Sequence, residues 1–309
     1  GDYQIRSRVI TSDSQIEAPS VGNTLTIDES LPITTSGVVA QDETWSGEVS
    51  LTGDVTIPEG VTVTIEAGTN INVTRFTDNT YGGSNVNLSE IIVEGHLLIQ
   101  GTEQYPVTLG PNQAPLNAGD WSGIRVFGSL VMEYAELSYA QYGVVCLANN
   151  IVTNCSIENS IISHSKHDAV YLESKSSGVL TAMLNHSSFI NSFGKGLYGV
   201  SNTGNDSQLH LTANNNNITE NTLGGVYLWA NGSSGNPLLS ADLSNNVIAS
   251  NKTYGAYFHT TNSAVSNIKF ANNTVQSNIN ASGAYFYNYS AGNTSTHSIN
   301  GNELSDNRL

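Results

Sequence analysis

The chain has 309 residues, a formal net charge of −16 and only ten lysines and arginines. Nucleic acids and anionic membranes bind proteins through basic patches, so this charge balance argues against both as partners. The sequence shows no membrane-inserting segment, and its wealth of Asn, Ser, Thr and Gly is typical of a well-solvated protein outside the cell. We therefore expect an extracellular or cell-surface location.

Residues 1–43 do not follow the pattern of the later chain. The segment DYQIRSRVI alternates polar and apolar residues like a strand, and a Ser/Thr-rich stretch without a clear period follows it. The first unit of a stacked repeat exposes its core and its strand edges unless something covers them. We interpret residues 1–43 as a strand, a linker and a cap for the domain that follows at residues 44–309.

From Thr44 the chain consists of short alternating segments separated by turns. They are interrupted by RFTDNTYGGSNVNLSE, residues 75–90, which is too long for a tight turn and is expected to project as a loop. Its side chains include oxygen donors of the kind that calcium prefers, namely Asp78, Asn79, Asn85 and Asn87. Because their spacing matches no known calcium-binding loop, the sequence predicts neither a metal nor any other cofactor.

From Tyr134 to the last residue the sequence repeats a unit of 26 to 30 residues. A glycine column consists of Gly143, Gly196, Gly225, Gly255 and Gly283, with Ala169 in its second place. Two residues further on, an aromatic column consists of Val145, Tyr171, Tyr198, Tyr227, Tyr257 and Tyr285, at spacings of 26, 27, 29, 30 and 28 residues. A period in this range is the mark of a solenoid, a propeller or an array.

Each unit contains three short alternating segments and no apolar spacing of the helical kind. This pattern predicts an all-β fold, a right-handed parallel β-helix with three strands per coil. Asparagine columns are expected at the corners that bound the second strand, because Asn tolerates the left-handed region and bonds to stacked neighbours. The two columns are Asn216, Asn246, Asn273 and Asn302, and Asn191, Asn221, Asn251, Asn278 and Asn307.

Two cysteines, Cys146 and Cys155, occupy columns that are otherwise apolar. Buried thiols are the favoured interpretation, and a disulfide across the coil stays open. Neither a metal site nor a catalytic role is expected for them.

The third segment of each unit sends one set of residues inward and its neighbours outward. The outward set is aromatic and consists of Tyr171, Tyr198, Tyr227, Tyr257 and Tyr285, with Trp229, His259 and Tyr287 beside them. Since coils stack about 4.8 Å apart, we expect a flat aromatic strip that binds the C–H faces of sugars. The alternative is a tyrosine ladder that stacks only on itself.

One cluster of titratable residues, in SHSKHDAVYLE, offers an alternative active site: His164, His167, Asp168 and Glu173. Two histidines three residues apart converge on a helix, but at a corner followed by a strand the spacing does not force convergence. Acidic residues elsewhere in the repeats are scattered, so no acid and base pair is expected. The sequence therefore predicts no catalytic residue, and surface decoration is the favoured account of this cluster.

The early segments carry the phrases Trp-Ser-Gly, Pro-Glu-Gly-Val-Thr, Ile-Glu-Ala-Gly-Thr and Gly-Asp-Trp-Ser-Gly-Ile. These resemble the opening turns of bacterial right-handed β-helix surface proteins, which share the pectate-lyase-like fold; the catalytic motifs of its enzymes are missing here. The Tyr-x-Ile-x-Ser start resembles the stem of minor-pilin-like proteins. Together the plan resembles the tāpirins, which are cellulose-binding adhesins.

The favoured function is a non-catalytic adhesin that binds an extended or insoluble polysaccharide, such as cellulose, through the aromatic strip. The resemblance implies attachment to a pilus or the cell envelope through a part N-terminal to this chain. Two alternatives stay open: a polysaccharide lyase or glycoside hydrolase of the pectate-lyase-like class, and a purely structural surface or fibre protein.

Overall fold

The computed structural model describes residues 33–202, 206–233, 235–290 and 295–308. The chain forms two units, Gly1–Pro32 and Ile33–Leu309, and everything below concerns the second. The expected N-terminal strand and most of the expected linker and cap lie outside the described residues.

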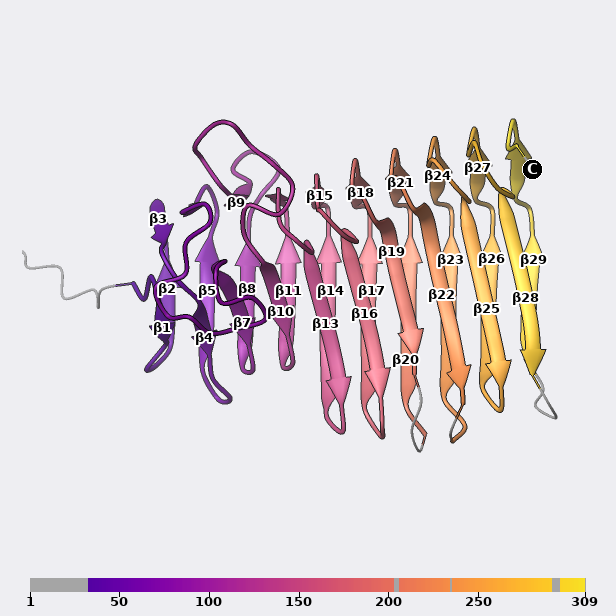
Figure 1. Cartoon of the computed structure of the whole chain (residues 1–309), viewed down its shortest axis with the longest axis horizontal. Helices are drawn as coiled ribbons and strands as arrows, with labels where there is room; N and C mark the ends of the chain where they lie inside the picture. Colours follow the sequence, from indigo (N-terminus) through magenta and orange to yellow (C-terminus); the bar gives the residue numbers. More distant parts are fainter. Residues whose placement is uncertain (1–32, 203–205, 234, 291–294, 309) are drawn as a thin grey trace, which may run out of the picture. The chain divides into compact units, whose positions relative to one another are not determined.

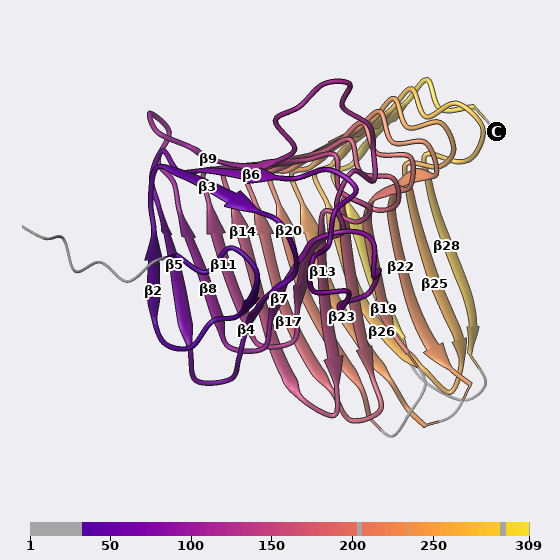
Figure 2. The ribbon, with the colours of Figure 1, turned by 60° about the vertical axis from the view of Figure 1, so that its left-hand side comes forward.

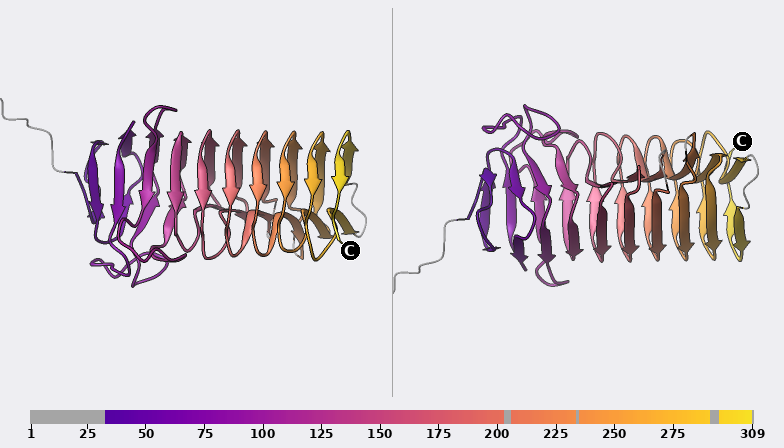
Figure 3. Two further views of the ribbon diagram at one scale, coloured as in Figure 1. Left: turned by 90° about the horizontal axis from the view of Figure 1, so that it is seen from above. Right: turned by 90° about the horizontal axis from the view of Figure 1, so that it is seen from below.

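The unit Ile33–Leu309 is a right-handed parallel β-solenoid of three ten-stranded sheets (Figure 1). Each coil contributes one strand to each sheet, and the strands of a sheet lie side by side along the coil axis (Figure 3). The described part of the chain contains no helix, and hence none long and apolar enough to cross a membrane. The predicted fold class is confirmed.

The strands of the three sheets follow one another in strict rotation. Sheet 1 contains β1 (Gly37–Val38), β4 (Val55–Ile57), β7 (Glu90–Val93), β10 (Gly123–Val126), β13 (Val144–Asn149), β16 (Val170–Lys175), β19 (Lys195–Ser201), β22 (Gly224–Gly232), β25 (Ala256–Asn262) and β28 (Ala284–Ser290). Sheet 2 contains β2 (Glu43–Trp45), β5 (Thr62–Glu66), β8 (His96–Gln100), β11 (Ser129–Glu133), β14 (Val152–Glu158), β17 (Val179–Asn185), β20 (Gln208–Asn214), β23 (Leu238–Ser244), β26 (Val265–Ala271) and β29 (Thr296–Asn300). Sheet 3 contains β3 (Glu48–Leu51), β6 (Asn70–Val73), β9 (Val107–Gly110), β12 (Ala135–Ser138), β15 (Ile161–Ser163), β18 (Ser188–Ile190), β21 (Asn217–Thr219), β24 (Val247–Ala249), β27 (Thr274–Gln276) and β30 (Glu303–Ser305).

The register agrees with the repeat read from the sequence. Tyr171 pairs with Tyr198, Tyr198 with Tyr227, Tyr227 with Tyr257, and Tyr257 with Tyr285. The solenoid also begins earlier than residue 44, because β1 and β2 already belong to its sheets.

The core lies inside the coil and is built by the alternation of each strand. In β22, Val226 and Leu228 are fully buried while Tyr227 between them is only half-buried. Near the C-terminal coils, Phe258 stacks on Phe286 with ring centroids 4.5 Å apart. Burial of this apolar column is the main driving force for folding, since each coil closes the hydrophobic face of its neighbour.

Two asparagine ladders run along the corners that bound sheet 3. In the first, Asn216 donates from Nδ2 to Asn246 Oδ1 (3.0 Å) and to the carbonyl of Leu184 in the preceding coil (2.7 Å). The second ladder, Asn221, Asn251, Asn278 and Asn307, is bonded in the same way. The expected place of Asn191 in this ladder is wrong, because Ser192 occupies that position and donates its N–H to Asn221.

The residue with left-handed backbone at each corner stands immediately before the ladder residue. Asn215, Asn245 and Asn272 have φ between 54° and 60° and precede the buried ladder asparagines. The two demands placed on Asn at these corners, a left-handed backbone and a stacked amide, are therefore met by two successive residues.

The glycine column marks a close approach of the chain to the next coil. A Cβ on Gly225 would lie 2.5 Å from the carbonyl oxygen of Gly255 and equally close to Ile248. No side chain fits there without a shift of the backbone. This is why glycine recurs where the strands of sheet 1 begin.

Cys146 and Cys155 are both buried free thiols, so the structure favours the first of the two interpretations. Burial raises the pKa of the Cys146 thiol well above its ordinary value. Both cysteines act as small apolar side chains in the core.

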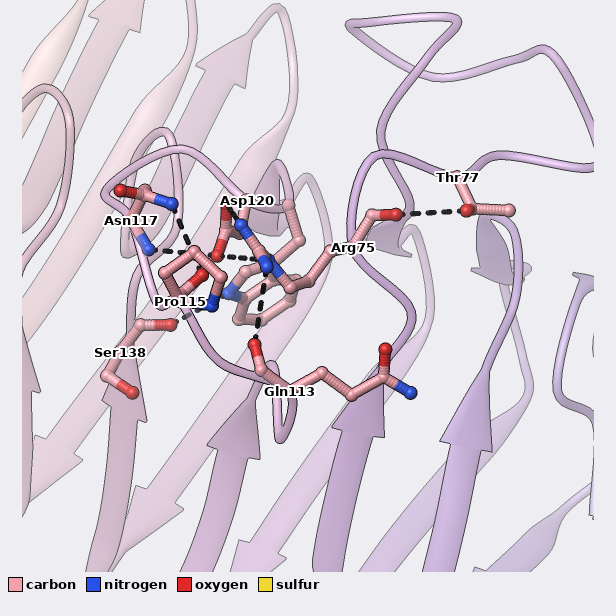
Figure 4. A network of polar contacts seen from close by, with 8 residues as sticks. Arg75, Thr77, Gln113, Pro115, Asn117, Asp120 and Ser138 are labelled. Atoms are coloured by element: carbon pink, nitrogen blue, oxygen red, sulfur yellow. Dashed lines mark hydrogen bonds and ion pairs between the residues drawn. The ribbon is translucent and has the colours of Figure 1, made fainter.

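Two loops project from the corner between sheet 3 and sheet 1 in the N-terminal coils (Figure 2). One is the expected loop at residues 75–90, between β6 and β7, and the other is residues 111–120, between β9 and β10. We call them the paired loops, since the Arg75 and Asp120 side chains join them (Figure 4).

Candidate functional site

The aromatic strip lies on the outer face of sheet 1, as the alternation of the strands predicts. Its members come from β16, β19, β22, β25 and β28, and their backbones pair in register. Tyr171, Tyr198 and Tyr227 are half-buried, whereas Tyr285 is 45% exposed and Tyr287 is 40% exposed.

The tyrosine rings of the strip stack on one another instead of lying flat on the sheet. The ring centroids of Tyr171 and Tyr198 are 5.0 Å apart at an interplanar angle of 26°, and those of Tyr198 and Tyr227 are 5.4 Å apart at 17°. Rings side by side in one plane cannot come this close without overlap of their edges. The strip therefore presents ring edges and hydroxyl groups, not the flat platform of ring faces expected from the sequence.

The stack changes direction between Tyr227 and Tyr257. These two rings are tilted by 60°, and Tyr254 packs against both from the neighbouring corner. Beside them Trp229 stacks on His259 at 5.4 Å and 10°. The two columns are also linked by a hydrogen bond of 3.2 Å between the Tyr227 hydroxyl and His259 Nδ1. The second half of the strip is thus two rings wide.

The hydroxyls of Tyr171, Tyr198 and Tyr227 keep their protons over the whole neutral range. Burial raises the pKa of Tyr171 and Tyr198, and it raises the pKa of Tyr227 to about 12. Neighbouring tyrosines add to the shift, because a second phenolate nearby would repel the first. These groups are therefore available as neutral hydrogen-bond donors and acceptors.

Asp168 of the alternative cluster lies directly beside the strip. Its buried Oδ1 accepts the backbone N–H of Lys195 (2.7 Å) and lies 3.6 Å from Lys195 Nζ. The same ammonium lies 4.8 Å from the ring centroid of Tyr198 and 5.8 Å from that of Tyr227. The cluster and the strip, which the sequence analysis treats as separate, are therefore joined through Lys195.

The two histidines of the cluster do not converge. His164 stacks on Tyr139 at 4.9 Å, and His167 stacks on Tyr142 at 4.6 Å. Burial lowers the pKa of His167, so its imidazole is mainly neutral at pH 7. No group of three or more His, Cys, Asp or Glu side chains within the described ranges is arranged to hold a metal ion.

Glu173 belongs to a row of polar side chains on the far side of Tyr171 from Asp168. Its Oε1 accepts Asn202 Nδ2 at 3.0 Å, and Asn231 Nδ2 donates to Asn202 Oδ1 at the same distance. This row borders the strip over the coils of β16, β19 and β22 and supplies amide and carboxylate groups there.

Of the column immediately before the glycine column, sequence reasoning identified Asp168 alone. This column supplies Tyr142, Asp168, Lys195 and Tyr254, all of which flank the strip. The repeat itself contained the signal, since each of these residues stands one place before a glycine or before Ala169.

The calcium candidates of the 75–90 loop do not converge either. The carboxylate of Asp78 is buried and accepts the backbone N–H groups of Thr80 (2.9 Å) and Gly82 (3.0 Å). Asn79 donates to Thr52, and Asn85 accepts the backbone N–H of Asn87. These groups fold the loop.

Beneath the loop, Asp54, which immediately precedes β4, lies beside Glu90, the first residue of β7. Glu90 forms an ion pair with Arg125 (2.9 Å) and accepts two hydrogen bonds from Ser84. Asp54 is buried, and among the described residues its Oδ2 has no hydrogen-bond partner. Burial, together with the nearby carboxylates of Asp78 and Glu90, raises the pKa of Asp54 to about 6.

Residues 34–150 match the model of a family described as pectate-lyase like beta helix domain. No curated protein sequence matches the chain significantly. The resemblance to the pectate-lyase-like fold noted from the early phrases is thereby confirmed for the N-terminal coils.

Several solved structures are similar to this chain at low sequence identity and with low TM-scores. A periplasmic alginate epimerase, AlgG, is 10% identical over 90% of this chain and 80% of its own, with a TM-score of 0.39. The Dettilon tailspike protein is 12% identical over 86% of this chain, which spans 55% of the tailspike, with a TM-score of 0.41. Endopolygalacturonase I from Stereum purpureum is 13% identical over 89% of this chain and 93% of its own, with a TM-score of 0.37. Their activities differ, and the likeness concerns the fold alone.

Proposed function

We propose that this chain is a non-catalytic carbohydrate-binding solenoid, an extracellular or cell-surface adhesin that holds an extended, cellulose-like polysaccharide along the aromatic strip. The observation that supports it best is the recurrence of an outward tyrosine in register on five successive strands of sheet 1. A surface that presents one tyrosine per coil suits a ligand that is itself a polymer of repeating units.

The dimensions of the strip suit such a ligand. Successive coils are about 4.8 Å apart, which is comparable to one sugar unit of an extended β-linked glycan. Each coil offers an apolar ring edge and a phenol hydroxyl, and sugars likewise alternate C–H groups and hydroxyls. Trp229 and His259 widen the strip, and Glu173 lies along its border. We propose that the bound polysaccharide chain runs parallel to the coil axis.

The experiment compares two variants of one strip residue, Tyr257, in pull-downs on insoluble cellulose, chitin and xylan. Tyr257 is half-buried, and its hydroxyl has no hydrogen-bond partner within the described residues. We expect Tyr257→Phe to weaken binding about fivefold, because the ring stays and one hydrogen bond of about 1 kcal/mol is lost. Tyr257→Ala should weaken it further, since the ring edge is lost as well.

Met183→Ala serves as the matched control, because Met183 is 48% exposed on the outer face of sheet 2. Equal binding by the parent, both Tyr257 variants and the Met183 variant would show that the strip is only a self-stacking ladder. The purely structural role would then be the better account.

A second candidate function is a polysaccharide lyase or glycoside hydrolase centred on the cluster beside the strip. It is favoured by the arrangement of a neutral His167 on Tyr142 next to the paired Asp168 and Lys195. These groups can exchange protons with a glycan that lies on the strip. Release of reducing or unsaturated sugars from xylan, alginate or polygalacturonate, abolished in His167→Ala or Asp168→Asn, would establish this function in place of the adhesin.

The place of the protein in the cell follows from the same proposal. An adhesin must be anchored, and we propose attachment to a pilus or the cell envelope through a part N-terminal to this chain. Immunolabelling of intact cells with antibodies to the solenoid tests the surface location, and labelling only after lysis would contradict it.

A further inference from the structure

The paired loops are held rigidly to each other by a buried ion pair. Arg75 Nε donates to Asp120 Oδ2 at 2.7 Å, and its Nη2 donates to Oδ1 at 3.2 Å (Figure 4). Asp120 is fully buried and also accepts the backbone N–H of Asn117 through Oδ2. The backbone N–H of Phe76 donates to the carbonyl of Asp120. A bidentate contact of this kind fixes the relative orientation of the guanidinium and the carboxylate and also neutralises their charges.

The outer surface of the 75–90 loop has no unpaired charge, although the chain carries a net charge of −16, since its one basic residue, Arg75, is half-buried and paired with Asp120. Its two acidic residues, Asp78 and Glu90, are buried and bind groups of the loop itself. The exposed side chains between them are those of Asn79, Thr80, Tyr81, Ser84, Val86 and Asn87. This surface offers amides, hydroxyls and one phenol, and it attracts no ion of either sign.

Tyr81 is the most exposed aromatic side chain of this surface, at 74%. Its ring has no stacking partner among the described residues, in contrast to the strip tyrosines, whose faces cover one another. Its backbone is left-handed, with φ of 56°, as is that of Phe76, with φ of 48°. Bulky residues are disfavoured in this region, so the loop holds two aromatic residues at its surface against a conformational cost.

The loops adjoin the corner that flanks the strip. Both connect sheet 3 to sheet 1, as do the corners that supply His167 and Lys195. Residues 111–120 reach the corner two coils further on, between β15 and β16, because a Cβ on Gly119 would lie 2.8 Å from Lys166 Cδ. A polysaccharide bound along the edge of the strip that adjoins the corners between sheets 3 and 1 therefore extends to the paired loops.

We infer that the paired loops are a second carbohydrate contact, in which a free face of Tyr81 stacks on a sugar ring and the surrounding amides and hydroxyls bind its hydroxyl groups. The ligand class is a neutral polysaccharide, because the one cation of the 75–90 loop, Arg75, is already paired with Asp120 and leaves no free positive charge there to bind uronate or sulfate groups. This inference rests on the proposed function, since both contacts serve one glycan. It adds the ring face that the stacked strip lacks and excludes anionic glycans as the ligand.

The test measures binding of the whole chain by affinity gel electrophoresis. The neutral probes are hydroxyethylcellulose and xyloglucan, and the anionic probes are alginate and polygalacturonate. We expect Tyr81→Ala to weaken binding to the neutral glycans by about tenfold, because exposed aromatic anchors carry a large share of recognition. Tyr81→Asn should behave alike and keep the loop folded, since Asn tolerates the left-handed region. Tyr105→Ala is the matched control, because Tyr105 is 57% exposed at a different corner, between β8 and β9.

The outcomes separate the two proposals. If the parent binds neutral glycans and both Tyr81 variants bind equally well, the loop contact is overturned and the strip proposal stands. Preference of the parent for the anionic probes overturns the ligand class inferred here. If the parent binds none of the four glycans and no insoluble one, both proposals fail together.

Discussion

The N-terminal and C-terminal coils share one cross-section but stabilise their corners in different ways. In the C-terminal coils the corners are closed by identical buried asparagines that bond from coil to coil. In the N-terminal coils the corner between sheets 3 and 1 carries the paired loops, held by individual contacts such as Arg75 with Asp120 and Arg125 with Glu90. A repeated side chain needs only its own copy as a partner, whereas each loop contact needs a specific partner distant in sequence. The repeated residues thus form the scaffold, and the paired loops, which do not repeat, form the distinctive surface of the N-terminal coils.

The largest expected effect is at the asparagine ladder. The Asn246 side chain makes four buried hydrogen bonds: Oδ1 accepts from both N and Nδ2 of Asn216, and Nδ2 donates to Ala213 O and Asn273 Oδ1. Asn246→Ala leaves several buried groups unpaired at about 1–3 kcal/mol each, so we expect stability to fall by at least about 3 kcal/mol in urea unfolding. The control is Asn245→Gly, at an exposed neighbour with φ of 60°. Equal urea midpoints for the two variants would contradict the structural role of the ladder.

The N-terminal coils should respond to pH through Asp54. Its pKa is raised from 3.8 in the unfolded chain to about 6 in the fold, so its contribution to stability is complete below about pH 4 and is lost as pH rises through 6. Asp54→Asn imitates the protonated carboxyl and keeps an oxygen for the backbone N–H of Glu90. We expect the variant to be more stable than the parent at about pH 7.5, by on the order of 2 kcal/mol.

The difference between parent and variant is the quantity to measure, because other groups titrate in both. Thermal midpoints recorded from about pH 4 to pH 8 should coincide at the acid end and diverge as Asp54 ionises beside Asp78 and Glu90. The lowered pKa of Asp78 acts in the opposite direction, so Asp78→Asn should destabilise the protein at neutral pH. A constant difference for Asp54→Asn over the whole range would show that Asp54 keeps its ordinary pKa.

The smallest expected effect is at the centre of the tyrosine ladder. The Tyr198 ring lies between Tyr171 and Tyr227, and its hydroxyl has no hydrogen-bond partner within the described residues. We expect Tyr198→Phe to change stability by less than about 0.5 kcal/mol and Tyr198→Ala to lower it by about 1–2 kcal/mol, through two lost stacking contacts. Urea unfolding distinguishes the two. A large loss in Tyr198→Phe would mean that the hydroxyls, and not the rings, hold this face together.

The sequence alone determined the solenoid, its period and the direction of almost every side chain in the repeats. Alternation along a strand has a fixed period of two, so the burial of Val226 and Leu228 and the outward position of Tyr227 could be read directly. The ladder at Asn216, Asn246 and Asn273 followed from the same columns, because parallel strands in register place identical residues next to each other.

Only the tertiary structure decided what the surface presents. Spacing in the sequence places Tyr171 and Tyr198 in neighbouring coils, but the tilt of their rings depends on packing across the stack. Likewise, nothing near Arg75 in the sequence indicates Asp120 as its partner, since Asp120 lies in another coil and in a loop without a period. Contacts between repeated residues are visible in a sequence because the period reveals them; contacts between unlike residues of different coils depend on the loops, which have no period.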